Sequence, residues 1–346
     1  MMKLRGTAFR FLLVAITVVL IAAACGGNDN DSANAGADGV GGSLNISGSS
    51  TVEPISAAVG QAFSSFNDDV TIAVDGPGTG DGFALFCEGE TDISDASRPI
   101  SEEEVATCEN NGIEYIELKV AIDGIAVLTS PNDTAVECLN FADLYALLGA
   151  ESEGFGNWSD ANDLGAELGS PHVPYPDQNL VVTAPGEESG TYDSFLEITL
   201  EEIAEEREQE NPVRPDYQAS ANDNVIIEGI GGNEGSLGWV GYAFYVQNSE
   251  VVRAIPVADG NGDDCVEPTD ETISSAEYPI ARFLYIYVNT ARLEENPAVE
   301  AYVDFYLSDD GMQFVGEVGY VQLASEDIEA TRSVWESKET GTRDGG

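Results

Sequence analysis

Small and hydroxyl-bearing residues gather where an apolar segment of this chain gives way to a helical pattern. The stretch Ser47–Pro54 follows the apolar segment 44–46 and precedes a helical pattern over residues 55–66. The N-terminus of a helix carries unpaired N–H groups and the positive end of the helix dipole, so it favours an anion. Ser50 and Thr51 are therefore candidate anion ligands, while a hydroxyl that only caps the helix is the simpler interpretation.

Two further stretches have the same composition. Residues 76–82 follow the strand-like segment 70–75, and residues 188–191 follow the strand-like segment 180–183. In both, glycine permits a close approach of the backbone to a ligand, and a hydroxyl can donate a hydrogen bond. The candidate ligands in these stretches are Thr79, Ser189, Gly190 and Thr191. Three such turns facing one cleft would form an oxyanion site without a metal.

Residues suited to catalysis are scarce. A hydrolase for phosphate esters would need a metal cluster or an activated nucleophile with a base. His172 is the only histidine, no Cys/His metal spacing exists, and the residues around Ser189 do not form the GxSxG nucleophile turn. We therefore expect no catalytic residue, no metal site and no cofactor, and we expect His172 to be a surface residue.

Four motifs follow one another along the chain: SGSSTVEPI, DISDASRPIS, ESGTYDSF and GSLGWVGYAF. In this order and spacing they resemble the phosphate-binding lipoproteins of bacterial phosphate ABC importers, from about Ser43 to Trp335. The resemblance implies a type II periplasmic-binding-protein fold, in which two α/β domains are joined by a hinge and enclose a ligand cleft. It also implies capture of inorganic phosphate and delivery to an ABC permease with its ATPase.

The resemblance assigns phosphate ligands by position, with two departures. Ser97 stands where many family members carry an aspartate, and Pro185 stands where many carry an arginine. We interpret Arg98 as the replacement cation, and a surface salt bridge to Glu102 or Glu103 is its alternative role. The implied ligand set is Ser50, Thr51, Thr79, Ser97, Arg98, Ser189, Gly190 and Thr191.

The identity of the ligand leaves alternatives open. A receptor for sulfate, molybdate or a phosphonate is the second hypothesis, and a surface phosphatase is a third from a different class. Phosphate near neutral pH keeps a proton, so a carboxylate that accepts this proton's hydrogen bond would exclude sulfate. Glu187 is the candidate acceptor, with Asp81 and Asp95 behind it.

The first residues form a targeting pattern. Residues 1–24 contain three basic residues and then an apolar run too short to span a bilayer, which is typical of an export signal. Cys25 follows three alanines and precedes two glycines, which resembles a lipoprotein cleavage site. We interpret residues 25–42 as a lipidated cysteine and a flexible tether. We expect an exported protein held at the outer face of the cytoplasmic membrane by its lipid alone.

Strand-like and helical segments alternate from residue 43 onward, which favours an α/β architecture. The length suffices for two domains of ordinary size. We place crossovers near Thr129 and Ala281, so that the first domain is discontinuous. The expected division is 43–128 plus 282–336 for domain 1, and 129–281 for domain 2.

Local signals place several helices. Ser101 begins a capping-box pattern for a helix that ends near Gly112, and Asn140 is placed to cap the next helix. After the third turn, a long acidic helix is expected to continue to about Gln209. Trp158 lies in a loop-rich segment and is expected to pack rather than to bind a ligand.

Four cysteines remain after Cys25, and an exported chain can keep disulfides. Three pairings are possible. We prefer Cys87–Cys108 and Cys138–Cys265, because each pair then lies within one expected domain and leaves domain closure unobstructed. Free buried thiols are the alternative.

The charge of the chain is extreme. It has 63 acidic and 13 basic residues, a formal net charge of −50, and Lys119 and Lys338 are the only lysines beyond the signal segment. Such a charge repels nucleic acid and anionic membrane surfaces. It favours adaptation to high salt, which screens the self-repulsion, although an acidic surface on an ordinary mesophile is the alternative. We expect a monomer.

Overall fold

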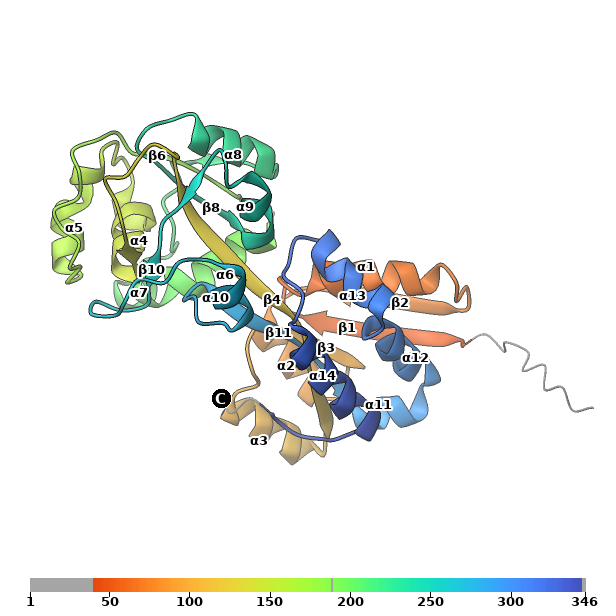
Figure 1. Ribbon diagram of the computed structural model, residues 1–346. Helices are drawn as coiled ribbons and strands as arrows, with labels where there is room; N and C mark the ends of the chain where they lie inside the picture. The colour runs from red at the N-terminus through yellow and green to blue at the C-terminus, as the bar shows by residue number, and fades with distance from the viewer. Residues whose placement is uncertain (1–39, 188, 344–346) are drawn as a thin grey trace, which may run out of the picture. The chain divides into compact units, whose positions relative to one another are not determined.

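The chain is represented by a computed structural model that describes residues 40–187 and 189–343 (Figure 1). The described residues belong to one compact unit. The expected signal segment 1–24, Cys25 and most of the expected tether lie outside the described residues. Among the residues that are described, no helix is long and apolar enough to cross a membrane.

A nine-stranded sheet organises the described chain, with strand order β2-β1-β3-β11-β4-β8-β6-β7 and with β9 beside β4. A second sheet consists of β10 and β5. The strands are β1 (Gly42–Gly48), β2 (Val70–Asp75), β3 (Ile93–Ala96), β4 (Tyr115–Thr129), β5 (Leu139–Asn140), β6 (Val181–Ala184), β7 (Gln218–Ala219), β8 (Ser236–Gly241), β9 (Arg253–Ala254), β10 (Val257–Ala258) and β11 (Ala281–Asn289).

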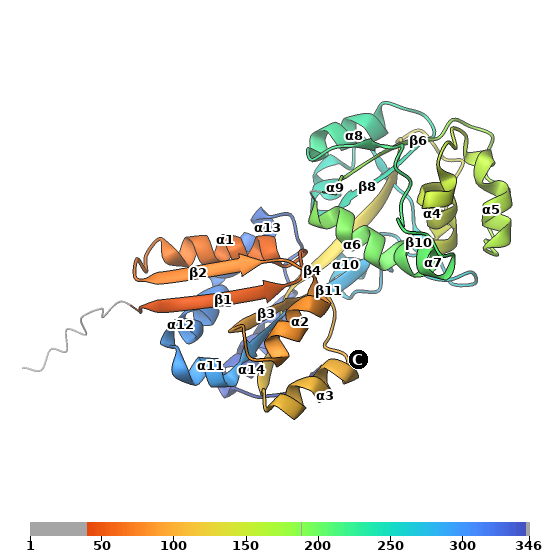
Figure 2. The ribbon, with the colours of Figure 1, turned by 180° about the vertical axis from the view of Figure 1, so that it is seen from behind.

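Helices alternate with the strands, as the sequence predicts, and the α/β class is confirmed. Helix α1 packs on β2, α2 packs on β1 and β3, and α8 packs on β8 (Figure 2). The α-helices are α1 (Glu53–Ser64), α2 (Thr79–Cys87), α3 (Glu102–Asn111), α4 (Phe141–Leu148), α5 (Asn162–Glu167), α6 (Gly190–Thr199), α7 (Glu201–Glu206), α8 (Asp223–Gly231), α9 (Tyr242–Asn248), α10 (Asp270–Ser274), α11 (Thr290–Glu295), α12 (Pro297–Tyr306), α13 (Asp309–Glu317) and α14 (Ser325–Ser337), with short 3-10 turns η1 (Ala150–Ser152) and η2 (Trp158–Ala161).

Strand β4 connects the two ends of the large sheet. Its first part, 115–124, pairs with β11, and its later part, 125–128, pairs with β8. Nearly every residue of β4 is buried, which agrees with its mostly apolar sequence YIELKVAIDGIAVLT. In Figure 1, β4 and β11 run together from the region of β3 toward the region of β8.

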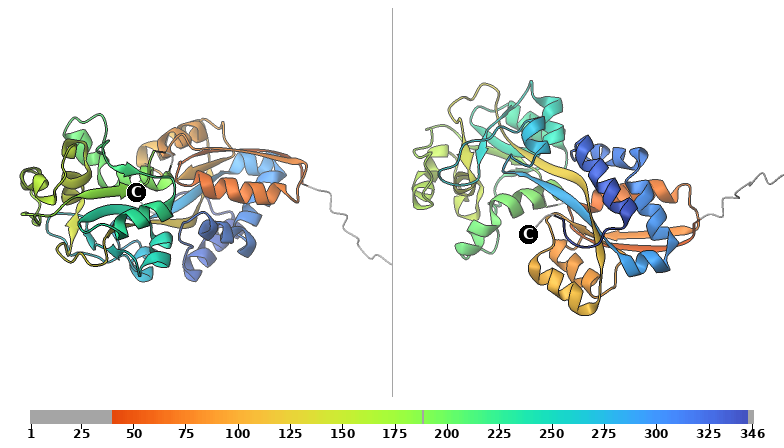
Figure 3. Two further views of the ribbon diagram at one scale, coloured as in Figure 1. Left: turned by 90° about the horizontal axis from the view of Figure 1, so that it is seen from above. Right: turned by 60° about the horizontal axis from the view of Figure 1, so that its bottom comes forward.

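The buried apolar residues form two large clusters. One gathers residues from both ends of the chain, 44–121 and 284–335, and the other gathers residues 122–280 with Leu323. Helix α12 packs against α1 and β1, and Figure 3 shows these early and late segments side by side. The division into two domains, with crossovers near Thr129 and Ala281, stays a prediction.

Several local predictions are confirmed. Ser101 and Glu104 form a reciprocal capping box at α3, which ends at Gly112 with a φ angle of 73°, and Asn140 and Asp143 form another at α4. Trp158 is fully buried and donates its indole N–H to the carbonyl of Gly235 at 2.8 Å, so it packs as expected.

Two local predictions are wrong. The acidic segment after the third turn forms two helices, α6 and α7, because Leu200 interrupts the regular helix between them. His172 is not a simple surface residue: its imidazole is half-buried and contacts the wholly buried carboxylate of Asp143. The histidine therefore belongs to the interior network of its loop.

The structure contains the disulfides Cys87–Cys108 and Cys138–Cys265, which is the preferred pairing. The first bridge links α2 to α3 and is almost completely buried. The second links the residue before β5 to a segment beside β10 and is more exposed.

Candidate functional site

The first predicted turn connects β1 to α1 and is packed tightly against β3. Gly48 has a φ angle of 151°, and a Cβ atom there would lie 2.0 Å from the carbonyl oxygen of Asp95, so only glycine fits. The hydroxyl of Ser49 accepts the backbone N–H of Thr51, and the cap residue Val52 makes no side-chain capping bond. The hydroxyl of Thr51 is therefore not consumed as the cap of α1.

The second turn, between β2 and α2, packs directly on the first. The N–H of Gly78 donates to the carbonyl of Gly48 at 2.9 Å. A Cβ atom at Gly82 would lie 2.3 Å from the Cα atom of Gly48, and one at Gly76 would lie 2.8 Å from the Cα atom of Ser50. These glycines thus allow a backbone contact that side chains would prevent.

The predicted ligand Thr79 of the second turn meets Ser97, the predicted ligand that follows β3. The hydroxyl oxygens of Thr79 and Ser97 lie 2.9 Å apart, and the N–H of Ser97 donates to the Thr79 hydroxyl at 3.2 Å. Thr79 begins α2 and Ser97 follows β3, so the parallel pairing of β1 with β2 and β3 brings their carboxyl ends to the same edge.

The third turn, between β6 and α6, reaches the first. Ser189 caps α6 by accepting the N–H of Thr191 at 3.2 Å. Asp193, in the first turn of α6, accepts the Ser50 hydroxyl at 3.0 Å. Ser194, the next residue of α6, has its hydroxyl 2.8 Å from the Thr51 hydroxyl. All three predicted turns therefore converge, with the first turn between the other two.

A cation that the sequence analysis missed lies at this convergence. The guanidinium of Arg282, at the start of β11, donates from Nη2 to the Ser194 hydroxyl at 3.1 Å and to the Thr51 hydroxyl at 3.4 Å. Its Nη1 forms an ion pair with Glu197 at 2.8 Å, and its side chain is 15% exposed. Arg282 thus contacts both the first and the third turns.

The buried carboxylate of Asp123 lies opposite Arg282. The two residues are direct partners in the β4–β11 ladder, and their Nε and Oδ2 atoms are 3.7 Å apart. Neither of these two atoms has a hydrogen-bond partner among the described residues. Burial raises the pKa of Asp123, and the nearby charge of Arg282 lowers it in part. A buried donor and a buried acceptor therefore remain unsatisfied beside the converging turns.

Further acidic groups surround the same place. Burial raises the pKa of Asp193, the hydrogen bond from Ser50 opposes this, and repulsion from Glu197 adds to it. The guanidinium of Arg282 therefore has to offset several carboxylates, and an anion that binds here needs its positive charge.

Arg98, the predicted cation, has a different partner. Its Nη1 and Nη2 atoms form two hydrogen bonds with Glu104, at 2.9 and 2.8 Å, and its guanidinium lies over the ring of Phe83. The alternative role, a salt bridge to Glu102 or Glu103, names the wrong glutamate. The partner is Glu104, because its position as the third residue of α3 turns its carboxylate back toward the start of the helix. A phosphate contact by Arg98 stays a prediction.

Two other arginines, Arg214 and Arg253, bind loop carbonyls and a neighbouring carboxylate instead of the converging turns. Arg214 pairs with Asp216 and donates to the carbonyls of Leu147 and Phe155. Arg253 donates to three backbone carbonyls, those of Asp133, Val136 and Ala254. Both guanidinium groups hold loops together.

The three predicted proton acceptors lie apart from Arg282. Glu187 is exposed and lines a cavity of about 550 Å³ with Tyr192 and Arg214, and Asp81 is also exposed. Asp95 is fully buried and accepts the hydroxyl of Ser56 beneath α1; burial raises its pKa to about 7, although that hydrogen bond lowers it. None of the three contacts the Thr51–Ser194 pair among the described residues.

Comparison with known proteins identifies the class. Residues 33–310 match the PBP superfamily domain. The chain is 36% identical to protein SphX of Synechocystis sp. over 88% of this chain and 85% of that protein. It is 32% identical to the phosphate-binding protein PstS of Staphylococcus saprophyticus, over 93% of this chain and 92% of that protein.

Solved structures give the same result. A possible phosphate binding protein from Planctomyces limnophilus superposes with a TM-score of 0.78 at 35% identity, covering 87% of this chain and 99% of that chain. The chain therefore belongs to the PBP superfamily, in the family that includes these SphX and PstS proteins. The predicted type II periplasmic-binding-protein fold is confirmed.

Proposed function

We propose that this protein captures inorganic phosphate outside the cytoplasm and delivers it to an ABC permease with its ATPase. The observation that carries the proposal is the meeting of Thr51, Ser194 and Arg282, which joins the first and third turns through hydroxyls and one guanidinium. The names of the relatives support phosphate as the ligand.

The proposed ligands supply donors of two kinds. Helix N-termini at α2 and α6 present N–H groups and a positive dipole end, and hydroxyls provide further hydrogen bonds. The set comprises Ser50, Thr51, Thr79, Ser97, Ser189, Gly190 and Thr191. We assign the counter-charge to Arg282 rather than to Arg98, because Glu104 already occupies both terminal nitrogens of Arg98. Phosphate would then take the place of the direct Thr51–Ser194 contact.

The proposed setting follows the targeting pattern. Residues 1–24 act as an export signal, Cys25 carries the lipid, and residues 26–42 are the tether to the membrane surface. The protein works as a monomeric binding protein without enzymatic activity and without nucleic acid. Domains 43–128 plus 282–336 and 129–281 close on the ligand about β4 and β11.

Calorimetric titration of the purified protein with phosphate, sulfate and molybdate, in molar sodium chloride, tests the function. We expect saturable binding of phosphate with one site and much weaker binding of the other two anions. Preferential binding of sulfate or molybdate would instead support the second hypothesis, a receptor for another oxyanion. Turnover of a phosphate ester in the presence of zinc and magnesium would instead support the phosphatase.

Selectivity against sulfate is expected to depend on Asp123 and not on Glu187. The Oδ2 atom of Asp123 is buried without a hydrogen-bond donor, so it can accept the hydrogen bond of a protonated phosphate oxygen, whereas sulfate would leave it unpaired and repelled. Asp123→Asn should weaken phosphate binding and reduce the preference over sulfate at least about tenfold. The exposed Glu187→Gln is the matched control, and an unchanged preference in Asp123→Asn would remove Asp123 from this role.

A further inference from the structure

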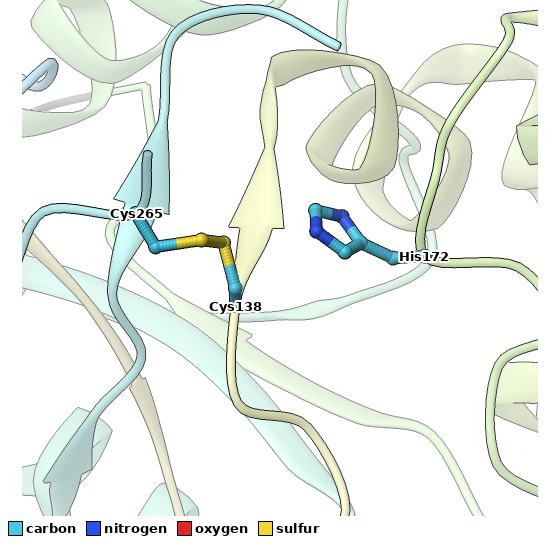
Figure 4. A group of neighbouring side chains, drawn as sticks. All are labelled: Cys138, His172 and Cys265. Carbon is cyan, nitrogen blue, oxygen red and sulfur yellow. A yellow bond between two sulfur atoms is a disulfide. The ribbon is translucent and has the colours of Figure 1, made fainter. Parts of the chain in front are cut away.

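A second cluster of chemically reactive side chains lies far along the chain from the converging turns. Cys138, His172 and Cys265 come from three separate loops, and one potential ligand atom from each lies within 4.8 Å of the others (Figure 4). The sulfur atoms form a disulfide in this structure. No spacing in the sequence predicts the group, because the three residues are widely separated.

The cluster is accessible. Cys265 is exposed, Cys138 and His172 are half-buried, and a cavity of about 340 Å³ beside them is lined by Glu137, Cys138, His172 and Tyr175. The other disulfide, Cys87–Cys108, is 1% and 0% exposed at its two residues. We therefore expect a reductant in solution to reach Cys138–Cys265 and to be excluded from Cys87–Cys108.

The imidazole of His172 is oriented by a buried carboxylate. Its Nδ1 atom contacts Oδ2 of Asp143, which is wholly buried. The Oδ1 atom of Asp143 also accepts the hydroxyl of Tyr175 at 2.6 Å, and the same residue belongs to the α4 capping box. Figure 4 shows the other ring nitrogen, Nε2, on the side that faces the two sulfur atoms.

The backbone holds both cysteines in place without the disulfide. Leu139, next to Cys138, pairs with Val257 of β10. Val257 in turn exchanges two hydrogen bonds of 2.9 Å with Val266, next to Cys265. The two thiols are therefore expected to remain neighbours after reduction, with Cα atoms near their present separation of 6.1 Å.

We propose that the reduced protein binds one zinc-type divalent ion through Sγ of Cys138, Sγ of Cys265 and Nε2 of His172. Zinc favours such thiolate and imidazole ligands in tetrahedral geometry, with water able to take an open fourth position. Zn–S bonds of about 2.3 Å place two thiolates about 3.8 Å apart, which small side-chain rotations reach from the bridged positions. A carboxylate that receives Nδ1–H is the usual outer partner of a metal-binding histidine.

The reaction requires a reductant of the dithiol class. One of its thiolates attacks a sulfur of the Cys138–Cys265 bond, this bond breaks, and a mixed disulfide forms. The second thiol of the reductant then displaces the mixed disulfide, so the protein gains two electrons and two protons while the reductant becomes a disulfide. Metal binding releases both thiol protons. The disulfide form has no free thiolate and does not bind the ion.

Titration with Co²⁺ and then Zn²⁺ tests the proposal on the full chain, after reduction by a phosphine and its removal without oxygen. We expect the reduced protein to bind one Co²⁺ with thiolate-to-metal absorption, which Zn²⁺ abolishes by displacement, and the oxidised protein to show no such absorption. Phosphate binding is a separate measurement, so this test does not depend on the proposed function.

Two variants sharpen the result, and both are compared with wild type in the reduced state, where every chain lacks the bridge. His172→Ala should weaken Co²⁺ binding by more than the roughly tenfold that losing an outer partner costs. The double variant Cys138→Ser/Cys265→Ser keeps the buried pair Cys87 and Cys108 and should bind no ion. Unchanged affinity in His172→Ala, persistent binding in the double variant, or no thiolate absorption in reduced wild type would each overturn the site.

Discussion

Replacing Arg282 with alanine is expected to weaken phosphate binding at least about tenfold. Its guanidinium donates to both Thr51 and Ser194 and is mostly buried, so no solvent charge replaces it. Removing one partner of a buried, hydrogen-bonded charge pair costs about 2–5 kcal/mol, and about 1.4 kcal/mol corresponds to a factor of ten. Calorimetric titration at fixed molar salt measures the change.

Two further variants separate charge from position. Arg282→Lys should recover only part of the affinity, because an ammonium group cannot copy the planar set of donors on a guanidinium. Arg98→Ala is the matched control, since its guanidinium forms a partly exposed ion pair with Glu104 through both terminal nitrogens. We expect Arg98→Ala to bind phosphate within about threefold of wild type.

Stability must be measured beside affinity, because Arg282→Ala leaves Asp123 buried without its cation. The double variant Arg282→Ala/Asp123→Asn removes that unpaired charge and should regain part of the lost melting temperature without regaining affinity. A folded Arg282→Ala protein that binds phosphate as well as wild type would exclude Arg282. A large loss in Arg98→Ala together with that result would restore Arg98 as the counter-charge.

Lowering the salt concentration is expected to destabilise the protein strongly. The net charge of −50 is largely screened in molar salt, where the Debye length is about 3 Å, and is exposed at 0.01 M, where it is about 30 Å. Burial raises the pKa of Glu201, and repulsion from Glu197 and Glu205 raises it further, so ionisation of this group opposes folding. Melting curves in sodium chloride from 0.01 to about 2 M measure the effect.

Helix α7, with sequence EEIAEE, supplies a control for this prediction. Glu202 and Glu206 are exposed and stand four residues apart, where like charges repel by about 0.2–0.5 kcal/mol at low salt. Glu202→Gln/Glu206→Gln should therefore raise the melting temperature at low salt and change it little in molar salt. Equal melting temperatures of wild type at both salt levels would contradict adaptation to high salt.

Local chemistry explains which parts of the site could be predicted. The three turns were found because glycine and hydroxyl residues after a strand leave a pattern within a few residues, and the capping boxes at Ser101 and Asn140 are equally local. Their contacts also follow from the fold, since parallel strands bring their carboxyl ends to one edge. The sequence alone could therefore locate Thr51, Thr79 and Ser97 near one another.

Arg282 could not be found in this way. It begins an apolar strand sequence, and its hydroxyl partners Ser194 and Thr51 are 88 and 231 residues away in the chain. Its partner Asp123 depends on the register of an antiparallel pair, which no short pattern encodes. A basic residue beside an expected crossover is the one signal that could have drawn attention to it.

Arg98 was predicted to be the phosphate-binding cation because its position in the sequence is conspicuous. It is the first basic residue after the expected signal segment and lies inside a motif. The competing partner, Glu104, was assigned in advance to the capping box, yet its carboxylate accepts from Arg98 as well as from Ser101. The prediction for Arg98 overlooked that Glu104 can cap α3 and bind a guanidinium at the same time.

The apolar cluster built from both ends of the chain has a consequence for the order of folding. The cluster of residues 122–280 is complete, apart from Leu323, once that continuous segment has been made. The other cluster also needs Val299, Tyr302 and Trp335, so the packing around Leu44, Ile46 and Phe63 stays incomplete until the last helices exist. We therefore expect the middle segment to fold first, while the segment with β1 and α1 stays incompletely packed and more prone to aggregation until the chain is complete.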